Sequence, residues 1–267
     1  MLSSPTKIIN MLNTIKNKGI KLIALFVLAF PFTQLHAQSA DDVINNYLKA
    51  IGGADKLNKL QSMKGWGNFQ QGGMNFPFVI YQKKPNSQLL EATFQGMTQK
   101  IAYDGASSSG WMINPFQGRS NAEKMDADQE KEYKFQSDIE GPFVNYAAKG
   151  YKVAYVGQED IDGSPAYHLT LTTKEGDIRD YYFDKDASLM VKEKDHIKQA
   201  DGSTSEGESN FSDYKEIDGM LIPFTVENVS EFQGQKYSSF IKMDSVKYNV
   251  AIDDAIFKMP DTTAPQK

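Results

Sequence analysis

The chain has 267 residues, a formal net charge of −5 and no cysteine. An acidic protein is a poor candidate for binding nucleic acid or an anionic membrane surface, because both carry negative charge and repel it. The absence of cysteine excludes disulfides and thiolate chemistry. The three histidines lack the spacing of metal ligands, so neither a metal nor a cofactor is expected.

The N-terminal segment has the pattern of a cleaved export signal. Three lysines between positions 16 and 21 precede an apolar run over residues 22–30, and Ala37 closes the segment with a small residue. A transmembrane helix needs roughly 20 apolar residues to cross a bilayer core of about 30 Å, so this run is too short to be one. The pattern predicts that residues 1–37 are a signal peptide.

Cleavage is expected between Ala37 and Gln38, and no cysteine follows that could carry a lipid anchor. The mature protein should therefore be released into the periplasm. Residues 38–267 are expected to form a single domain, because one β-rich barrel or sandwich can reach this length.

A helix is predicted directly after the cleavage point. Ser39 is a suitable N-cap, apolar residues recur at helical spacing from Val43 to Ile51, and Gly52-Gly53 ends the helix. A second short helix is expected from about Asp55.

From residue 61 apolar residues recur at every second position, which indicates strands. Met74, Phe76, Phe78 and Ile80 alternate with their neighbours after a Gly72-Gly73 hairpin signal. Turn signals recur along the rest of the chain without long helical crossovers, so the strands should pair antiparallel. The expected order is two helices, five strands, a helical insertion, about seven strands and a terminal helical turn at 253–257.

The insertion, Asn121 to Ala148, is charged and breaks the strand pattern. We predict a helix over residues 121–138 and a further helical turn over 140–148. An approximate stripe that includes Met125, Tyr133 and Ile139 should pack against the concave side of the sheet and be buried.

No catalytic motif is complete, and no enzyme is predicted. The segment Gly105–Gly110 fails the G-x-S-x-G test, because a serine replaces the second glycine. Asp184–Ser188 lacks the glycine and glutamate of a calcium loop, so a β-turn is expected. Asp195-His196 could form half of an acid–base pair, but His168 cannot be placed relative to it.

The strands carry many large apolar residues, and two interpretations of them stay open. They could simply fill the core, or a curved sheet could enclose an apolar pocket that its helices do not fill. The candidates for the pocket wall are Phe76, Phe78, Leu90, Trp111, Leu169, Tyr182 and Phe224.

Several stretches resemble exported bacterial proteins of the outer-membrane lipoprotein-sorting type, the LolA/LolB-like carriers. They are Ala40–Leu60 with a strand starting near Met63, Gly141–Gly157, Asp180–Leu189, Phe211–Pro223 and Asp254–Pro260. The resemblance implies an α+β, mainly antiparallel fold, an unclosed β-barrel in which one curved sheet wraps over helices. It also implies an apolar cavity for acyl chains. Neither arginine, Arg119 or Arg179, lies in a motif that matches the functional arginine of that family.

Two classes of function follow. The first is a periplasmic carrier whose ligand is the acyl chain of a lipid or lipoprotein, working with membrane-associated transport proteins. The second is an interaction or sensor domain on the same fold with a filled core. A secreted hydrolase is a distant third.

Overall fold

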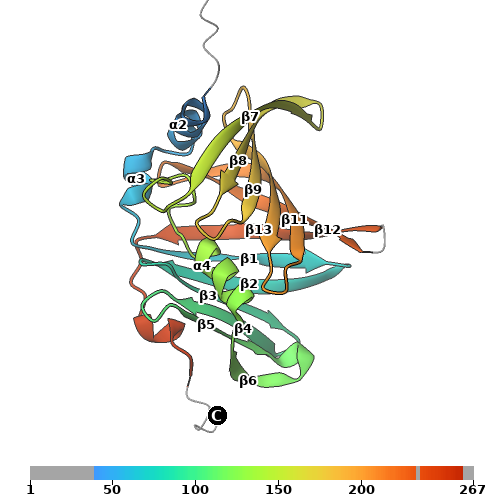
Figure 1. Cartoon of the computed structure of the whole chain (residues 1–267). Helices are drawn as coiled ribbons and strands as arrows, with labels where there is room; N and C mark the ends of the chain where they lie inside the picture. Colours follow the sequence, from blue (N-terminus) through green and yellow to red (C-terminus); the bar gives the residue numbers. More distant parts are fainter. Residues whose placement is uncertain (1–38, 233–234, 261–267) are drawn as a thin grey trace, which may run out of the picture. The chain divides into compact units, whose positions relative to one another are not determined.

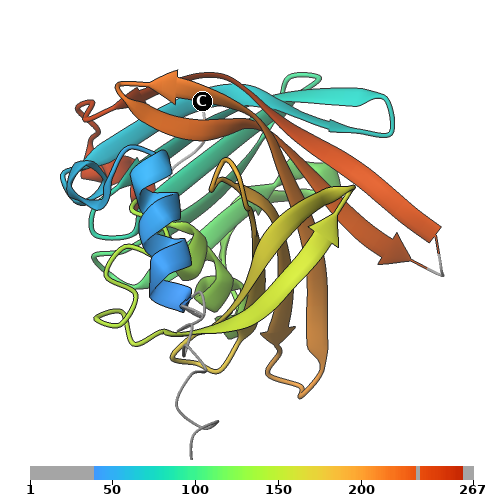
Figure 2. The same ribbon diagram turned by 90° about the horizontal axis from the view of Figure 1, so that it is seen from above.

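The strands of this protein pair side by side in one antiparallel sheet. The computed structural model describes residues 39–232 and 235–260. Within these ranges the sheet has thirteen strands in the order β6-β5-β4-β3-β2-β1-β13-β12-β11-β10-β9-β8-β7. β6 and β7 are the two edges and do not pair with each other, so the sheet is not closed. It curls around the helix α4 (Figures 1 and 2). The predicted fold class, an unclosed and mainly antiparallel barrel wrapped over helices, is confirmed.

The strands before α4 form one wing of the sheet. They are β1 Ser62–Gln71, β2 Met74–Lys83, β3 Ser87–Phe94, β4 Met97–Asp104, β5 Ser109–Asn114 and β6 Arg119–Lys124. The strands after α4 form the other wing. They are β7 Lys152–Ile161, β8 Ser164–Thr172, β9 Ile178–Asp184, β10 Met190–Lys198, β11 Thr204–Ile217, β12 Met220–Phe232 and β13 Gln235–Tyr248.

The pairing of β1 with β13 joins the two wings. The register shifts between Trp66 and Gly67, where β13 carries an extra residue. A Cβ atom on Gly67 would lie 2.4 Å from the backbone oxygen of Lys242, a separation that real Cβ atoms do not adopt. Only glycine therefore fits the close approach of the two strands at this bulge.

The first two helices are the ones predicted. In α2, Ala40–Ala50, the Ser39 side chain accepts from the amide of Asp42, and the Asp42 side chain accepts from the amide of Ser39, which completes a capping box. Val43, Ile44 and Leu48 are buried on one side of the helix. They pack with the short helix α3, Ala54–Asn58, and with inward side chains of β8 and β9 in the larger of two core clusters.

The insertion differs from its prediction. Residues 119–124 form strand β6, the helix α4 spans only Ala127–Gln136, and residues 140–148 are turns. Asp126 and Gln129 form a capping box that starts the helix there. Met125 is buried but precedes the helix, and no residue of α4 is fully buried. The predicted stripe is therefore buried only at Met125, whereas Tyr133 and Ile139 are partly buried. Ile139 follows α4 and packs against the larger core cluster.

The smaller core cluster lies on the other side of the sheet, away from α4. Trp111 packs there with residues of β3 and β4 and with Phe257. The predicted terminal turn is confirmed as the 3-10 helix η2, Asp254–Phe257. The Trp111 indole donates from Nε1 to the Phe257 carbonyl oxygen at 2.7 Å. This turn covers the outer face of the first wing.

Phe257 should be a main stabiliser of this outer cluster, since only 1% of it is exposed. We expect Phe257→Ala to lower the free energy of unfolding by about 3–5 kcal/mol in urea denaturation, because it leaves a cavity. Met259→Ala is the control, because Met259 is 36% exposed and its loss should change stability by less than about 0.5 kcal/mol. Equal effects of the two substitutions would contradict the assignment.

Candidate functional site

A buried arginine anchors α4 inside the curled sheet. Arg179 on β9 is 2% exposed. Its guanidinium donates from Nη2 to Glu132 Oε2 of α4 at 2.5 Å and from Nη1 to Asp195 Oδ1 of β10 at 2.6 Å. The guanidinium carbon also lies 3.8 Å from the ring centre of Phe135 on α4, a cation–π distance. The contacts of Arg179 thus connect α4 directly to β9 and β10.

Two partly buried carboxyl groups share the site with Arg179. Burial, and then the neighbouring charge of Asp195, raises the pKa of Glu193 to about 8. Burial also raises the pKa of Asp195, although Arg179 opposes this shift. Burial alone would lower the pKa of Arg179, but the carboxylates of Asp195 and Glu132 outweigh it and raise that pKa above its ordinary value. Arg179 therefore stays charged, and near neutral pH the two β10 acids hold a proton between them.

Other polar contacts tie α4 to both wings. Toward the second wing, Lys131 Nζ donates to Asp177 Oδ1 at 3.0 Å. Toward the first wing, Glu130 Oε1 accepts from the amide of Gly110 at 3.0 Å. At the end of the helix, Gln82 Nε2 donates to the Gln136 carbonyl oxygen at 3.0 Å. The helix is thus held by charges and hydrogen bonds on several sides.

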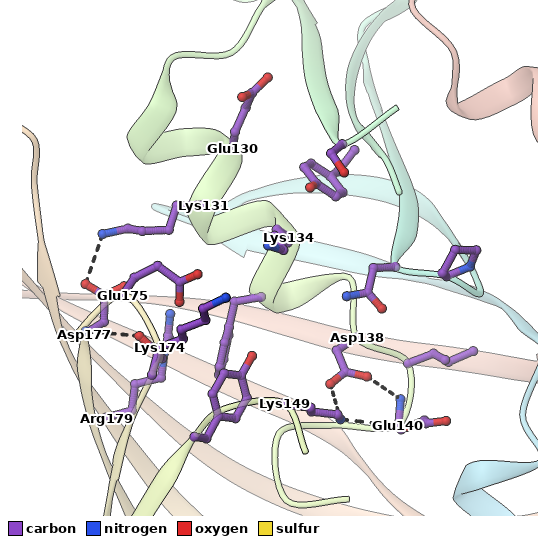
Figure 3. Close-up of a pocket in the computed structure, with 18 of the residues that line it drawn as sticks. Glu130, Lys131, Lys134, Asp138, Glu140, Lys149, Lys174, Glu175, Asp177 and Arg179 are labelled. Atoms are coloured by element: carbon purple, nitrogen blue, oxygen red, sulfur yellow. Dashed lines mark hydrogen bonds and ion pairs between the residues drawn. The ribbon is translucent and has the colours of Figure 1, made fainter. Parts of the chain in front are cut away.

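A cavity of about 740 Å³ lies beside α4. It is bounded by α4, the segment 138–151 and the turns that follow β2 and β8 (Figure 3). Aromatic and aliphatic side chains line part of it, but its rim is crowded with charge. Much of that charge is already paired, as in Lys84 with Glu140, Lys149 with Asp138 and Lys131 with Asp177. A cavity walled by ion pairs is a poor container for an acyl chain.

The inner face of β2 and β3 is apolar instead. Gln82 on β2 donates a hydrogen bond to the last turn of α4 and another, of 2.8 Å, to Gln88 on β3. Side chains alternate between the two faces of a strand, so residues two positions from Gln82 and Gln88 lie on the same inner face. These include Ile80 and Leu90, which oppose each other across the strands. Both are only partly buried. The apolar surface on this face is therefore only partly covered.

The apolar surface continues along the strands away from α4 as a row of phenylalanines. The ring centres of Phe69 and Phe76 are 6.0 Å apart, and those of Phe76 and Phe94 are 4.7 Å apart. All three side chains are partly exposed. We call Phe69, Phe76, Ile80, Leu90 and Phe94 the apolar inner face.

The structure places three of the seven predicted pocket residues together. Phe76, Phe78 and Leu90 share the inner face of β2 and β3. Phe78 is 7% exposed and packs over Gly67 of β1, where a Cβ atom would lie 2.7 Å from its ring.

The other four predicted residues lie elsewhere. Leu169 is fully buried in the core cluster under α2. Phe224 is buried beneath Lys215, whose Nζ lies 4.4 Å from its ring centre. Trp111 and Tyr182 lie on the outer face, where Trp111 contacts the terminal turn and Tyr182 stacks on His168 with ring centres 4.5 Å apart. The seven residues do not line one cavity.

Sequence reasoning left Phe69 and Phe94 out of the candidate site. Hairpin register could have found them, because Phe69 opposes Phe76 and Phe94 precedes a two-residue turn at the end of β3. Aromatic residues at matching positions of neighbouring strands share a face.

The two histidines of the described chain lie on the outer face of the second wing. His168 bonds to Glu159 at 2.7 Å and to Asp180 at 3.0 Å. His196 Nε2 lies 3.3 Å from Asp180, whereas Asp195 points inward to Arg179. Asp195 and His196 therefore do not form an acid–base pair. Among residues 39–232 and 235–260, no group of three or more His, Asp or Glu side chains is arranged to hold a metal ion.

The family model that matches residues 122–260 is described as "-like: Uncharacterized protein". The match covers just over half of the chain. The chain belongs to this family. No curated protein matches the sequence.

Solved structures share the fold at low sequence identity. A LolA superfamily protein from Nitrosomonas europaea matches with a TM-score of 0.57 and 15% identity, over 83% of this chain and 98% of that one. A DUF1329 family protein from Desulfovibrio piger matches with a TM-score of 0.54 and 16% identity, over 82% and 96%. A putative outer membrane lipoprotein-sorting protein domain from Vibrio parahaemolyticus matches with a TM-score of 0.51 and 10% identity, over 81% of this chain and 94% of that one. The fold is LolA-like.

The two arginines of the chain offer a matched test of the α4 anchor. We expect Arg179→Ala to lower the free energy of unfolding by about 3–5 kcal/mol, because it leaves partly buried carboxylates unpaired. Arg119 pairs with Glu123 at the surface, with 53% of its side chain exposed, so Arg119→Ala should cost at most about 1 kcal/mol. Chemical denaturation of both variants measures the difference, and similar losses would refute the anchor.

The raised pKa of Glu193 should make stability depend on pH. The folded state keeps the proton up to about pH 8, whereas an ordinary glutamate releases it near 4.5. Between these values the folded state binds more protons than the unfolded state, so the free energy of unfolding should fall as pH rises. We expect Glu193→Gln to flatten this slope when urea midpoints are compared across the window. Glu216→Gln, at an exposed position, should keep the slope, and an unchanged slope in Glu193→Gln would contradict the prediction.

Proposed function

We propose that this protein is exported and binds an acyl chain, of a lipid or of a lipoprotein, along the apolar inner face. The observation that carries the proposal is the row of partly exposed Phe69, Phe76 and Phe94 beside Ile80 and Leu90. Burying these partly exposed apolar side chains under an apolar ligand removes apolar surface from water, which makes the free energy of binding more favourable.

The polar character of α4 supports this assignment. The helix lies inside the sheet and is held by Arg179, Asp177 and Gly110 through polar contacts, while Ile80 and Leu90 on the inner face stay partly exposed. The fold is consistent with the proposal, since two of the similar structures are described as a LolA superfamily protein and a putative outer membrane lipoprotein-sorting domain.

The remaining parts of the proposal concern the whole chain. Residues 1–37, which lie outside the described residues, would direct export to the periplasm, and residues 38–267 would act as one lipid-binding domain. No helix within the described ranges is long and apolar enough to cross a membrane. The partners would be acyl chains and membrane-associated transport proteins, and no reaction is proposed.

Binding of a fluorescent fatty acid to the purified protein tests the proposal. We expect Phe76→Ala and Leu90→Ala each to weaken binding about tenfold, which corresponds to losing roughly 50 Å² of buried apolar contact. Val79→Ala is the control, because Val79 lies on the same strand, is also partly buried and points to the opposite face.

If the folded wild-type protein neither retains lipid nor binds the fatty acid, the carrier assignment fails. The interaction-domain alternative would then replace it. Equal losses in all three variants would also contradict the site, because they would show that the inner face has no special role.

A further inference from the structure

Three large apolar side chains are exposed at the turns of the first wing. Met74 is 47% exposed, Met97 40% and Phe116 38%. Met74 follows the β1–β2 turn, Met97 follows the β3–β4 turn, and Phe116 lies in the 3-10 helix η1, Pro115–Gln117, between β5 and β6. Alternate turns of an antiparallel sheet lie at the same end, so these three side chains project from one end of the wing.

The three residues belong to one continuous apolar surface. The ring centre of Phe116 lies 6.4 Å from that of Phe76 and 6.5 Å from that of Phe94. Met97 opposes Phe94 across the last pair of β3 and β4, and Met74 starts the strand that carries Phe76. We call Met74, Met97 and Phe116 the apolar tip. It adjoins the apolar inner face through Phe76 and Phe94.

The turns that carry the apolar tip contain no charged residue. Residues 65–79, 92–99 and 110–118 contain no Asp, Glu, Lys or Arg, although 24% of the chain is charged. Their polar side chains are mainly amides, as in Asn75 and Gln117. Charged groups are costly to bring to the boundary of a bilayer, whereas amides can hydrogen-bond to headgroups without this cost.

The turns that carry Met74 and Met97 have the backbone conformation of tight hairpin turns. The β1–β2 turn is Gly72-Gly73 with φ of 56° and 79°, and the β3–β4 turn is Gln95-Gly96 with φ of 51° and 81°. Positive φ at both central residues is typical of tight two-residue hairpin turns. The apolar tip is therefore presented by short turns that need little ordering when they bind.

We propose that the apolar tip docks the protein onto the surface of a phospholipid bilayer, with Met74, Met97 and Phe116 inserted among the headgroups. The proposal rests on the proposed acyl-binding function, since a chain that moves to or from the apolar inner face needs an apolar reservoir beside Phe76 and Phe94. The absence of charge favours a bilayer as the occupant, and flexible methionines suit its fluid surface. Binding should not require anionic lipid, because the protein is acidic and Arg119, the cation closest to Phe116 in the sequence, is paired with Glu123.

Flotation with vesicles of phosphatidylcholine alone tests the proposal. We expect the wild-type protein to float with the vesicles at low and at high salt. The triple variant M74S/M97S/F116S should lose at least tenfold in vesicle binding. The matched control is V156S/I178S, because Val156 is 55% and Ile178 39% exposed on β7 and β9, and this variant should float like the wild type.

Thermal denaturation verifies that the triple variant is folded, and fatty-acid binding in solution separates the two proposals. The triple variant should still bind the fluorescent fatty acid, because the apolar inner face is intact. If the wild type binds no fatty acid but floats through the tip, the proposed function fails and the docking surface stands.

Three results would overturn the docking surface. They are a wild-type protein that does not float, a triple variant that floats as well as the wild type, and binding that requires anionic lipid and disappears in salt. Light scattering tests whether a second copy of the protein occupies the tip instead of a bilayer. If the wild type forms dimers that the triple variant cannot form, and neither floats, the tip is a contact between two copies and the bilayer proposal is wrong.

Discussion

The Arg179 guanidinium is buried inside the curled sheet, and the position of α4 depends on it. A buried cation is stable only where carboxylates and hydrogen bonds compensate its lost hydration. Glu132 on α4 and Asp195 on β10 provide that compensation at its two terminal nitrogens, and Phe135 covers the guanidinium. If the helix moved away from β9, the buried guanidinium would lose Glu132 as a partner and the ring of Phe135 as a cover.

This way of holding a helix has a consequence for the rest of the interior. A helix that packs through an apolar stripe would bury the sheet face beneath it, as α2 does with Val43, Ile44 and Leu48. α4 has no fully buried residue and holds its place by polar contacts. The interior thus has a charged side, with the cavity beside α4, and an apolar side along β1 to β4 that the helices of residues 39–260 leave partly exposed. The proposed acyl chain binds on the apolar side.

The two wings differ in surface chemistry as well. The outer face of the second wing is rich in ionisable groups, such as the histidines around Asp180, whereas the turns at one end of the first wing carry no charge. A LolA-like fold by itself does not require this difference, since fold and function are separable. The proposed bilayer contact follows from the uncharged turns and their continuity with the apolar inner face.

The sequence by itself determined the features that depend on neighbouring residues. Ser39, the apolar spacing after it and Gly52-Gly53 were enough to predict α2, and alternating apolar residues between turn signals predicted antiparallel strands. The α4 boundaries were missed, because residues 119–124 pair with β5 and this pairing decides their conformation. Only the tertiary structure decided which face of each strand points inward. A strand has two alternating faces, and long-range pairing, bulges such as the one at Gly67 and the position of the covering helices select between them. For that reason Phe76 and Leu90 came together on the inner face, while Trp111 and Tyr182 were placed on the outer one.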